Sequence, residues 1–117
     1  MSKKVKLLFN PRCAKCREAY GILNEQGCEV EIIEYLKDTP TEMELKEVLK
    51  KLGLKPEDLL RKKEPLFVEK YKGKKLSDAE WIKVMHQNPI LIERPVAIYG
   101  NKAIIGRPAE RVVEILK

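Results

Sequence analysis

The 117-residue sequence has few of the features that would assign it to a special class of protein. Its longest apolar runs, such as VAIY and ILI, are far shorter than the about 20 residues of a membrane span. The opening MSKKVK leads into no apolar segment of the secretory type, and no repeat or low-complexity tract follows. These shortages predict a globular protein of the cytoplasm that makes no contact with a membrane.

Cysteine and histidine are also scarce, with three cysteines and one histidine. A structural zinc site needs four ligands, yet the C-x-x-C pair formed by Cys13 and Cys16 has no second pair at metal spacing. We therefore expect no metal, and we expect the isolated Cys28 to be a packing residue and His86 to contact free carbonyls at the end of its helix. Cytosolic thiols stay reduced, so the pair itself is expected to serve catalysis, redox sensing or packing.

The charge balance is basic, with 24 Lys and Arg residues against 18 Asp and Glu residues and a net charge of +6. This excess favours an anionic partner without specifying its kind. The basic residues are spread along the chain, and the few aromatic residues do not interleave with the densest runs, RKKEP and EKYKGKK. Binding to nucleic acid is therefore not expected.

The N-terminal part predicts a parallel strand–helix–strand unit. Alternating apolar residues indicate a strand over Lys4–Asn10, and helical spacing indicates a helix over Ala14–Gln26 that Gly27 ends. A second alternating run over Glu29–Tyr35 predicts the next strand. A helix of this length between two strands is typical of a parallel connection.

A helical insertion is predicted at about residues 40–90. Thr41 with Glu44, and Ser77 with Glu80, form two capping boxes that begin helices, and PEDLLRK between them indicates a short helix. The first helix carries an apolar stripe and ends at Gly53.

The C-terminal part predicts a hairpin followed by a helix. RPVAIYG and KAIIGR are short β-rich runs separated by a Gly-Asn turn, and PAERVVEILK indicates a helix with Val112, Val113 and Leu116 facing inward. The order is thus βαβ, helical insertion, ββα. It predicts an α/β protein, residues 1–117 as a single domain, with a mixed four-stranded sheet of the thioredoxin-like type.

The cysteine pair follows the first predicted strand, where the first helix begins. Unpaired backbone N–H groups and the helix dipole stabilise a thiolate there, and Arg12, Lys15 and Arg17 add positive charge, so we expect an activated Cys13. Cys16 lies one helical turn further on, within the range of a disulfide. Two interpretations remain for Cys16, a thiol that resolves an oxidised Cys13 or a small buried apolar residue.

Three arginines are candidates for holding an anion: Arg61 in LLRKKEP, Arg94 in IERPVAIYG and Arg107 in IIGRPAE. A guanidinium group suits a tetrahedral oxyanion because it donates two parallel hydrogen bonds. Arg94 stands at the entrance of the predicted hairpin, close to the end of the first strand in a sheet of this type, so it is expected to approach Cys13. An X–Pro bond at that entrance can adopt the cis form.

The motifs NPRC and CREA after the first strand, LLRKKEP in the middle, and NPILIERPVAIYGNKAIIGRPAERVVEIL at the end resemble the glutaredoxin-coupled arsenate reductase family. The resemblance implies that Cys13 attacks arsenate, that Arg61, Arg94 and Arg107 bind the oxyanion, and that a second thiol releases arsenite. It also implies an external thiol donor in place of a bound cofactor. The C-x-x-C pair suggests that Cys16 resolves the adduct, with glutathione and glutaredoxin, or thioredoxin, as donor.

Two alternatives stay open at this point. The C-x-x-C pair also resembles the Spx-type regulators, which bind the RNA polymerase alpha subunit and respond to disulfide stress. The arginine of GRPAE favours the reductase, because a regulator has no oxyanion to hold. The other alternative is a general thiol oxidoreductase that acts on a disulfide or a glutathione adduct.

Overall fold

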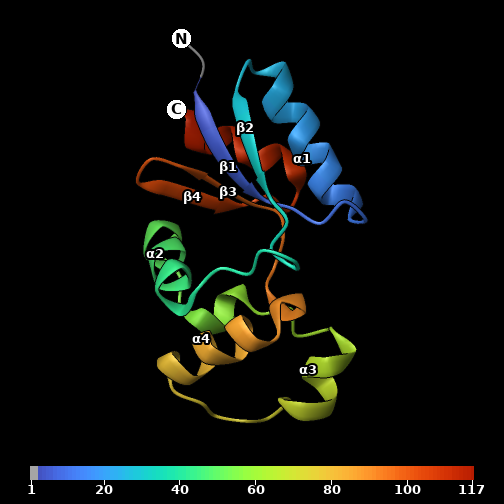
Figure 1. Cartoon of the computed structure of the whole chain (residues 1–117), viewed down its shortest axis with the longest axis vertical. Helices are drawn as coiled ribbons and strands as arrows, with labels where there is room; N and C mark the ends of the chain where they lie inside the picture. The colour runs from blue at the N-terminus through green and yellow to red at the C-terminus, as the bar shows by residue number, and fades with distance from the viewer. Residues whose placement is uncertain (1–2) are drawn as a thin grey trace. The chain divides into compact units, whose positions relative to one another are not determined.

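The computed structural model describes residues 3–117, which divide into two compact units (Figure 1). The first unit comprises the chain up to Asp38 together with Arg94–Lys117, and the second comprises Thr39–Glu93. The predicted helical insertion falls inside the second unit. The assignment of residues 1–117 to a single domain stays a prediction.

The first unit is built on a mixed four-stranded sheet. Its strands are β1 (Lys4–Leu8), β2 (Glu29–Ile33), β3 (Val96–Tyr99) and β4 (Lys102–Ile105), in the order β2-β1-β3-β4. β1 pairs in parallel with β2, whereas β3 pairs antiparallel with both β1 and β4. Helix α1 (Ala14–Glu25) connects β1 to β2, as the sequence predicts for a parallel connection. The α/β class and the mixed four-stranded sheet are therefore confirmed.

The C-terminal helix η3 (Ala109–Leu116) is a 3₁₀ helix. Its buried side chains are Ala109, Val112 and Ile115. The predicted inward face is confirmed for Val112 and also for Leu116, which is half-buried and packs against the hydrophobic core, but it was wrong for Val113, which is half-buried and is not part of that packing. The reason is the pitch, because three residues per turn bring every third side chain onto one face, whereas an α-helix needs 3.6 residues per turn.

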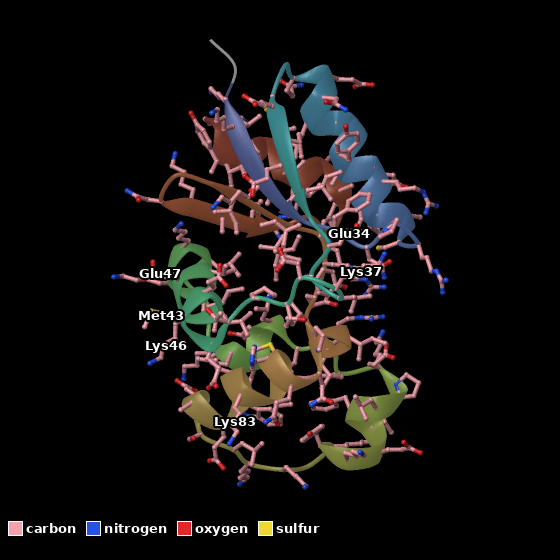
Figure 2. All side chains as sticks on the ribbon, viewed as in Figure 1. Glu34, Lys37, Met43, Lys46, Glu47 and Lys83 are labelled. Atoms are coloured by element: carbon pink, nitrogen blue, oxygen red, sulfur yellow. The ribbon has the colours of Figure 1, made fainter. Side chains whose placement is uncertain are left out.

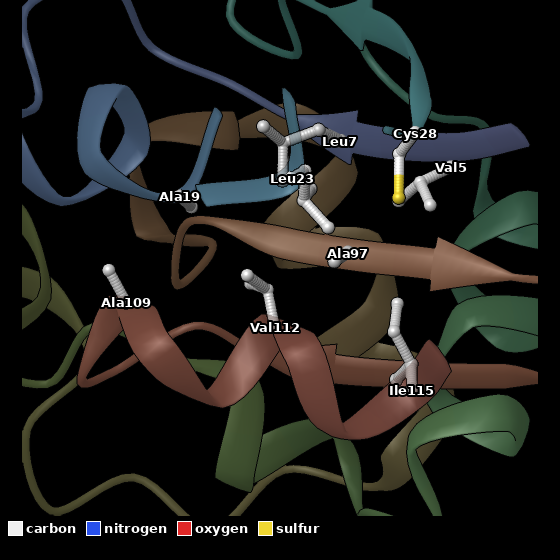
Figure 3. Close-up of a cluster of buried hydrophobic side chains, with 9 residues drawn as sticks. All are labelled: Val5, Leu7, Ala19, Leu23, Cys28, Ala97, Ala109, Val112 and Ile115. Atoms are coloured by element: carbon white, nitrogen blue, oxygen red, sulfur yellow. The ribbon is translucent and has the colours of Figure 1, made fainter. Parts of the chain in front are cut away.

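One hydrophobic cluster joins the sheet of the first unit to α1 and η3 (Figure 3). Its buried members are Val5, Leu7, Ala19, Leu23, Cys28, Ala97, Ala109, Val112 and Ile115. The cluster contains side chains from both helices, so α1 and η3 lie side by side on one face of the sheet. Cys28 is 8% exposed inside this cluster, which confirms it as a packing residue.

The second unit is helical. It contains α2 (Glu42–Leu52), η1 (Pro56–Leu59), α3 (Pro65–Lys70), α4 (Asp78–Gln87) and η2 (Pro89–Leu91). Both predicted capping boxes are confirmed, because Thr41 Oγ1 accepts a hydrogen bond from the Glu44 N–H over 3.0 Å and Ser77 Oγ accepts one from the Glu80 N–H over 3.2 Å. The six-residue α3 was not predicted, since its surrounding sequence reads as a basic loop.

Helix α2 has the amphipathic character that its sequence indicates. Leu45, Val48 and Leu49 are buried, while Met43 and Lys46 project from the helix (Figure 2), and Met43 is 76% exposed. In the same unit His86 Nδ1 lies 2.9 Å from the carbonyl oxygen of Pro40. The prediction that His86 contacts the free carbonyls of its own helix was wrong, because a carbonyl from a distant segment supplies the partner.

Candidate active site

The loop between β1 and α1 fixes the position of the first cysteine. The Cys13 N–H donates to the Asn10 carbonyl oxygen over 2.9 Å, and the Arg12 N–H donates to Asn10 Oδ1 over 3.0 Å. Asn10 therefore closes a tight turn through both its main chain and its side chain. Cys13 then becomes the N-cap of α1, with φ of −91° and ψ of 118°.

The Cys13 thiol is activated by its surroundings. Burial by itself raises its pKa, but the pKa ends below the ordinary thiol value, chiefly because the Cys16 backbone N–H and the Cys16 thiol donate hydrogen bonds to the sulfur. The positive charge of Arg94 and the Lys15 backbone N–H lower the pKa further. The predicted activation of Cys13 at the N-terminus of α1 thus has its physical basis in backbone donors, the Cys16 thiol and one cation that is distant in the sequence.

The source of the positive charge differs from the one predicted. The side chains of Arg12, Lys15 and Arg17 are exposed. Lys15 Nζ lies 3.6 Å from a carboxylate oxygen of Glu18, and Arg17 Nη1 donates to the Pro11 carbonyl oxygen over 2.8 Å. The expectation that these three charges lower the pKa of Cys13 was wrong, because that charge effect comes from Arg94.

The pKa of Cys16 is raised, whereas that of Cys13 is lowered. Cys16 is fully buried, and burial together with the hydrogen bond and the charge of Cys13 raises its pKa to about 12. Its own S–H therefore stays protonated and donates to Cys13. The burial fits the packing interpretation of Cys16, and the hydrogen bond fits the interpretation as a partner of Cys13.

Arg94 reaches this pair from the start of β3. It is half-buried, and its Nε atom is buried with no hydrogen-bond acceptor within residues 3–117. Its carbonyl oxygen accepts a hydrogen bond from Arg107 Nε over 2.8 Å, so the two predicted arginines meet through the Arg94 main chain. The peptide bonds Arg94–Pro95 and Arg107–Pro108 are both cis.

Gly106 allows the strand ends that carry the two arginines to come together. A Cβ atom at this position would lie 2.9 Å from Pro95 Cγ and 2.9 Å from Val112 Cγ1, which is too close for ordinary contact. The Gly106 N–H also donates to the Pro95 carbonyl oxygen over 2.9 Å. Sequence reasoning missed the supporting roles of Gly106 and Asn10, and their only signal was the position of each beside a predicted site residue.

Arg61 lies in the second unit and has partners there. Its Nη2 is 3.1 Å from a Glu64 carboxylate oxygen and its Nε is 3.9 Å from one of Glu93, while Nη1 donates to the Ile90 carbonyl oxygen over 3.1 Å. All three guanidinium nitrogens are thus engaged within the unit. A role for Arg61 in holding an anion stays a prediction.

Two further findings concern the residues from 3 to 117. No three His, Cys, Asp or Glu side chains in this range come together as candidate ligands of a metal ion. Within the same range, every helix is too short or too polar to cross a bilayer.

Fold and site together define a class of protein: an α/β protein with an activated cysteine at the N-terminus of its first helix, a buried second thiol and a nearby guanidinium group. This arrangement is typical of thiol chemistry on a small substrate. The model of the ArsC family matches residues 8–115. The chain belongs to the ArsC family, which confirms the resemblance to arsenate reductases and places it among the arsenate reductase-like enzymes.

Individual relatives support this assignment over nearly the whole chain. The uncharacterized protein YfgD of Escherichia coli is 42% identical over 118 residues, which cover 99% of each protein. The arsenate reductase of Haemophilus influenzae is 39% identical over 112 residues, or 94% of this chain and 97% of that protein. The solved structure of an arsenate reductase from Vibrio cholerae has a TM-score of 0.94 at 38% identity, covering 98% of this chain and 99% of the other. The predicted thioredoxin-like fold is confirmed, and the Spx-type alternative is not favoured.

Proposed function

We propose that the protein reduces arsenate to arsenite with Cys13 as the nucleophile. The Cys13 thiolate attacks arsenic(V), a sulfur–arsenic bond forms, and one arsenate oxygen leaves as water after protonation. Cys16 then attacks the Cys13 sulfur, and the sulfur–arsenic bond breaks with its electron pair remaining on arsenic. The products are arsenite and a Cys13–Cys16 disulfide, so the two electrons gained by arsenic come from the two thiols.

The observation that carries this proposal is the environment of Arg94. A half-buried guanidinium lies close enough to Cys13 to stabilise its negative charge, and its Nε–H has no acceptor in the described part of the chain. A buried donor without an acceptor is costly, and an oxyanion placed beside Cys13 would supply that acceptor together with the opposite charge. In this proposal Arg94 contacts the substrate and Arg107 holds the Arg94 main chain in place.

The state of Cys16 supports the second step. Its pKa is raised by burial first and then by the hydrogen bond and negative charge of Cys13. Once the Cys13 sulfur is bonded to arsenic, that sulfur no longer carries a full negative charge, so two of the causes that keep Cys16 protonated weaken. Attack on arsenic thus prepares the second thiol for its own attack.

The disulfide has to be reduced by an external thiol, and we propose glutathione with glutaredoxin, or thioredoxin, in that role. A disulfide product within one chain favours thioredoxin, because such a disulfide is reduced through exchange with a second dithiol. Reduced thiols are maintained in the cytoplasm, which is where we propose that the reaction occurs. Arg61 is included in the proposal as a third oxyanion ligand, on the family resemblance alone.

Arsenite formation measured separately with the thioredoxin system and with the glutathione–glutaredoxin system tests the proposal. We expect turnover by the wild type, loss of turnover in Cys13→Ser, and loss of thioredoxin-supported turnover in Cys16→Ser. Cys28→Ser is the matched control, since Cys28 lies in the hydrophobic cluster. Turnover that survives Cys13→Ser would refute the assignment of Cys13 as the nucleophile. Full thioredoxin-supported turnover in Cys16→Ser would show that Cys16 is a packing residue and not the resolving thiol.

A further inference from the structure

The second unit contains a cavity that the cysteine chemistry does not use. It has a volume of about 630 Å³ and lies between the end of η1, helix α3 and the start of α4. This volume falls within the range of small-molecule sites, which is roughly 300–1,000 Å³. Every residue that lines the cavity belongs to the second unit.

Three aromatic rings contribute to the apolar part of the cavity wall, beside Leu60 and Val68. Phe67 and Trp81 are stacked with their ring centroids 6.0 Å apart, and Tyr71 lies 6.3 Å from Phe67 and 6.1 Å from Trp81. Phe67 and Trp81 are buried, whereas Tyr71 is half-buried and so keeps part of its surface open. A wall of this kind favours contact with a flat ring, because offset and edge-on aromatic pairs are stabilised beyond the area that they bury.

Four lysines surround the aromatic residues, and a single acidic residue, Glu57, shares the lining with them. Lys62 and Lys63 precede α3, whereas Lys72 and Lys74 follow it on either side of Gly73. Within residues 3–117, none of these four ammonium groups has a carboxylate at ion-pairing distance. Four positive charges against one negative charge leave an excess of three, which attracts an anion.

The indole nitrogen of Trp81 is a second, independent observation. The side chain is 2% exposed, and Nε1 is buried without an acceptor in the part of the chain that the structure describes. Buried donors are nearly always paired, and Trp81 is one of the residues that line the cavity, so its indole N–H still lacks an acceptor at this place. An oxygen or nitrogen atom of a bound ligand would provide it.

We propose that this cavity binds a small anion whose flat ring system is joined to a phosphate or carboxylate group, as in a nucleoside monophosphate. The ring packs against the half-exposed Tyr71, and the anionic group lies among the lysines. Lys74 already contacts the Tyr71 ring, with Nζ 5.6 Å from the ring centroid, so charge and ring are juxtaposed before any ligand arrives. The site is independent of the proposed arsenate chemistry, and failure of either proposal leaves the other untouched.

Trp81 supplies the assay, because it is the only tryptophan of the sequence. AMP and phenyl phosphate, which both join a ring to a phosphate, are titrated into the full-length protein while Trp81 emission is recorded, and equilibrium dialysis measures the bound ligand directly. Adenosine tests the ring without the charge, and inorganic phosphate tests the charge without the ring. We expect saturable binding of AMP or phenyl phosphate, about tenfold tighter than that of either half alone, and weaker in high salt.

Two pairs of substitutions test the location. Lys63→Gln combined with Lys72→Gln removes two charges from the cavity rim, and we expect affinity to fall about tenfold. Lys46→Gln combined with Lys50→Gln removes the same charge from exposed positions of α2, and we expect no change (Figure 2 shows Lys46). The proposal is overturned if dialysis detects neither ligand, if phosphate or adenosine alone binds as tightly as AMP, or if both double variants weaken binding equally.

Discussion

Replacing Arg94 with glutamine tests the centre of the proposed mechanism. The substitution removes the cation that lowers the pKa of Cys13 and a buried N–H donor that has no acceptor within residues 3–117. It leaves the hydrogen bond from Arg107 in place, because that bond ends on the main-chain carbonyl of Arg94. The variant is therefore expected to fold while losing one group of the site.

The expected loss follows from the hydrogen bonds that the guanidinium can donate. A hydrogen bond to a charged group contributes about 1.5–3 kcal/mol, and a guanidinium offers an oxyanion two of them in parallel. Taking the lower value for each, because Arg94 is only half-buried, gives about 3 kcal/mol. This corresponds to a fall in kcat/KM of about 150-fold for arsenate, in the range found when an oxyanion-binding donor is removed from other enzymes.

Steady-state arsenite formation measures the loss of kcat/KM. The pH dependence of iodoacetamide alkylation at Cys13 measures the change in the pKa of Cys13. In Arg94→Gln the alkylation midpoint should move to higher pH, whereas Arg94→Lys should keep most of the charge effect and still lose kcat/KM, because an ammonium group lacks the bidentate fork. Arg111→Gln is the matched control, since Arg111 is exposed and pairs with the exposed Glu114 at 3.6 Å. A folded Arg94→Gln variant that matches the control in both assays would refute the reasoning.

Three further predictions follow from the packing around the same site. Cys16→Ala should raise the pKa of Cys13, because the thiolate loses the hydrogen bond from the Cys16 thiol, and alkylation of Cys13 would detect the change. Because the folded-state pKa of Cys16 is raised to about 12, the wild type should lose stability as pH rises above the usual thiol pKa of about 8.5. Denaturant unfolding of Cys16→Ala should lack this contribution, and equal pH profiles for the two proteins would contradict it. Gly106→Ala should lower the free energy of unfolding by about 1–3 kcal/mol, because the added Cβ would meet Pro95 and Val112 at 2.9 Å. Gly21→Ala in α1, where nothing lies within 4 Å of an added Cβ, should instead be neutral or stabilising.

Local chemistry explains which parts of the fold the sequence could predict. Both capping boxes are confirmed, because a box needs only a hydroxyl and a carboxylate three residues apart. The position of Cys13 at the N-cap of α1 is likewise confirmed, since the end of a strand and the start of a helical pattern are both visible in neighbouring residues. The order of strands and helices follows from these signals and from the rule for parallel connections.

Interactions between distant residues explain what the sequence missed. The positive charges beside Cys13 in sequence lie on exposed side chains, so the cation that lowers its pKa is Arg94, 81 positions further along. Similarly, the lysines on both sides of α3 and Trp81 line one cavity only after the helices have packed. The spacing of basic and aromatic residues along the chain does not reveal this cavity. The pitch of η3 was also not predictable from its pattern, since the same residues suit three or 3.6 residues per turn.

The sequence by itself thus determined where helices begin, which elements form the sheet and which cysteine stands at a helix N-terminus, because each depends on residues a few positions apart. Tertiary structure alone decided which arginine stabilises the thiolate, how Cys16 holds its proton, and where lysines and aromatic rings share a cavity. Burial and Coulomb attraction act through space, and their strength depends on distances that chain order does not specify.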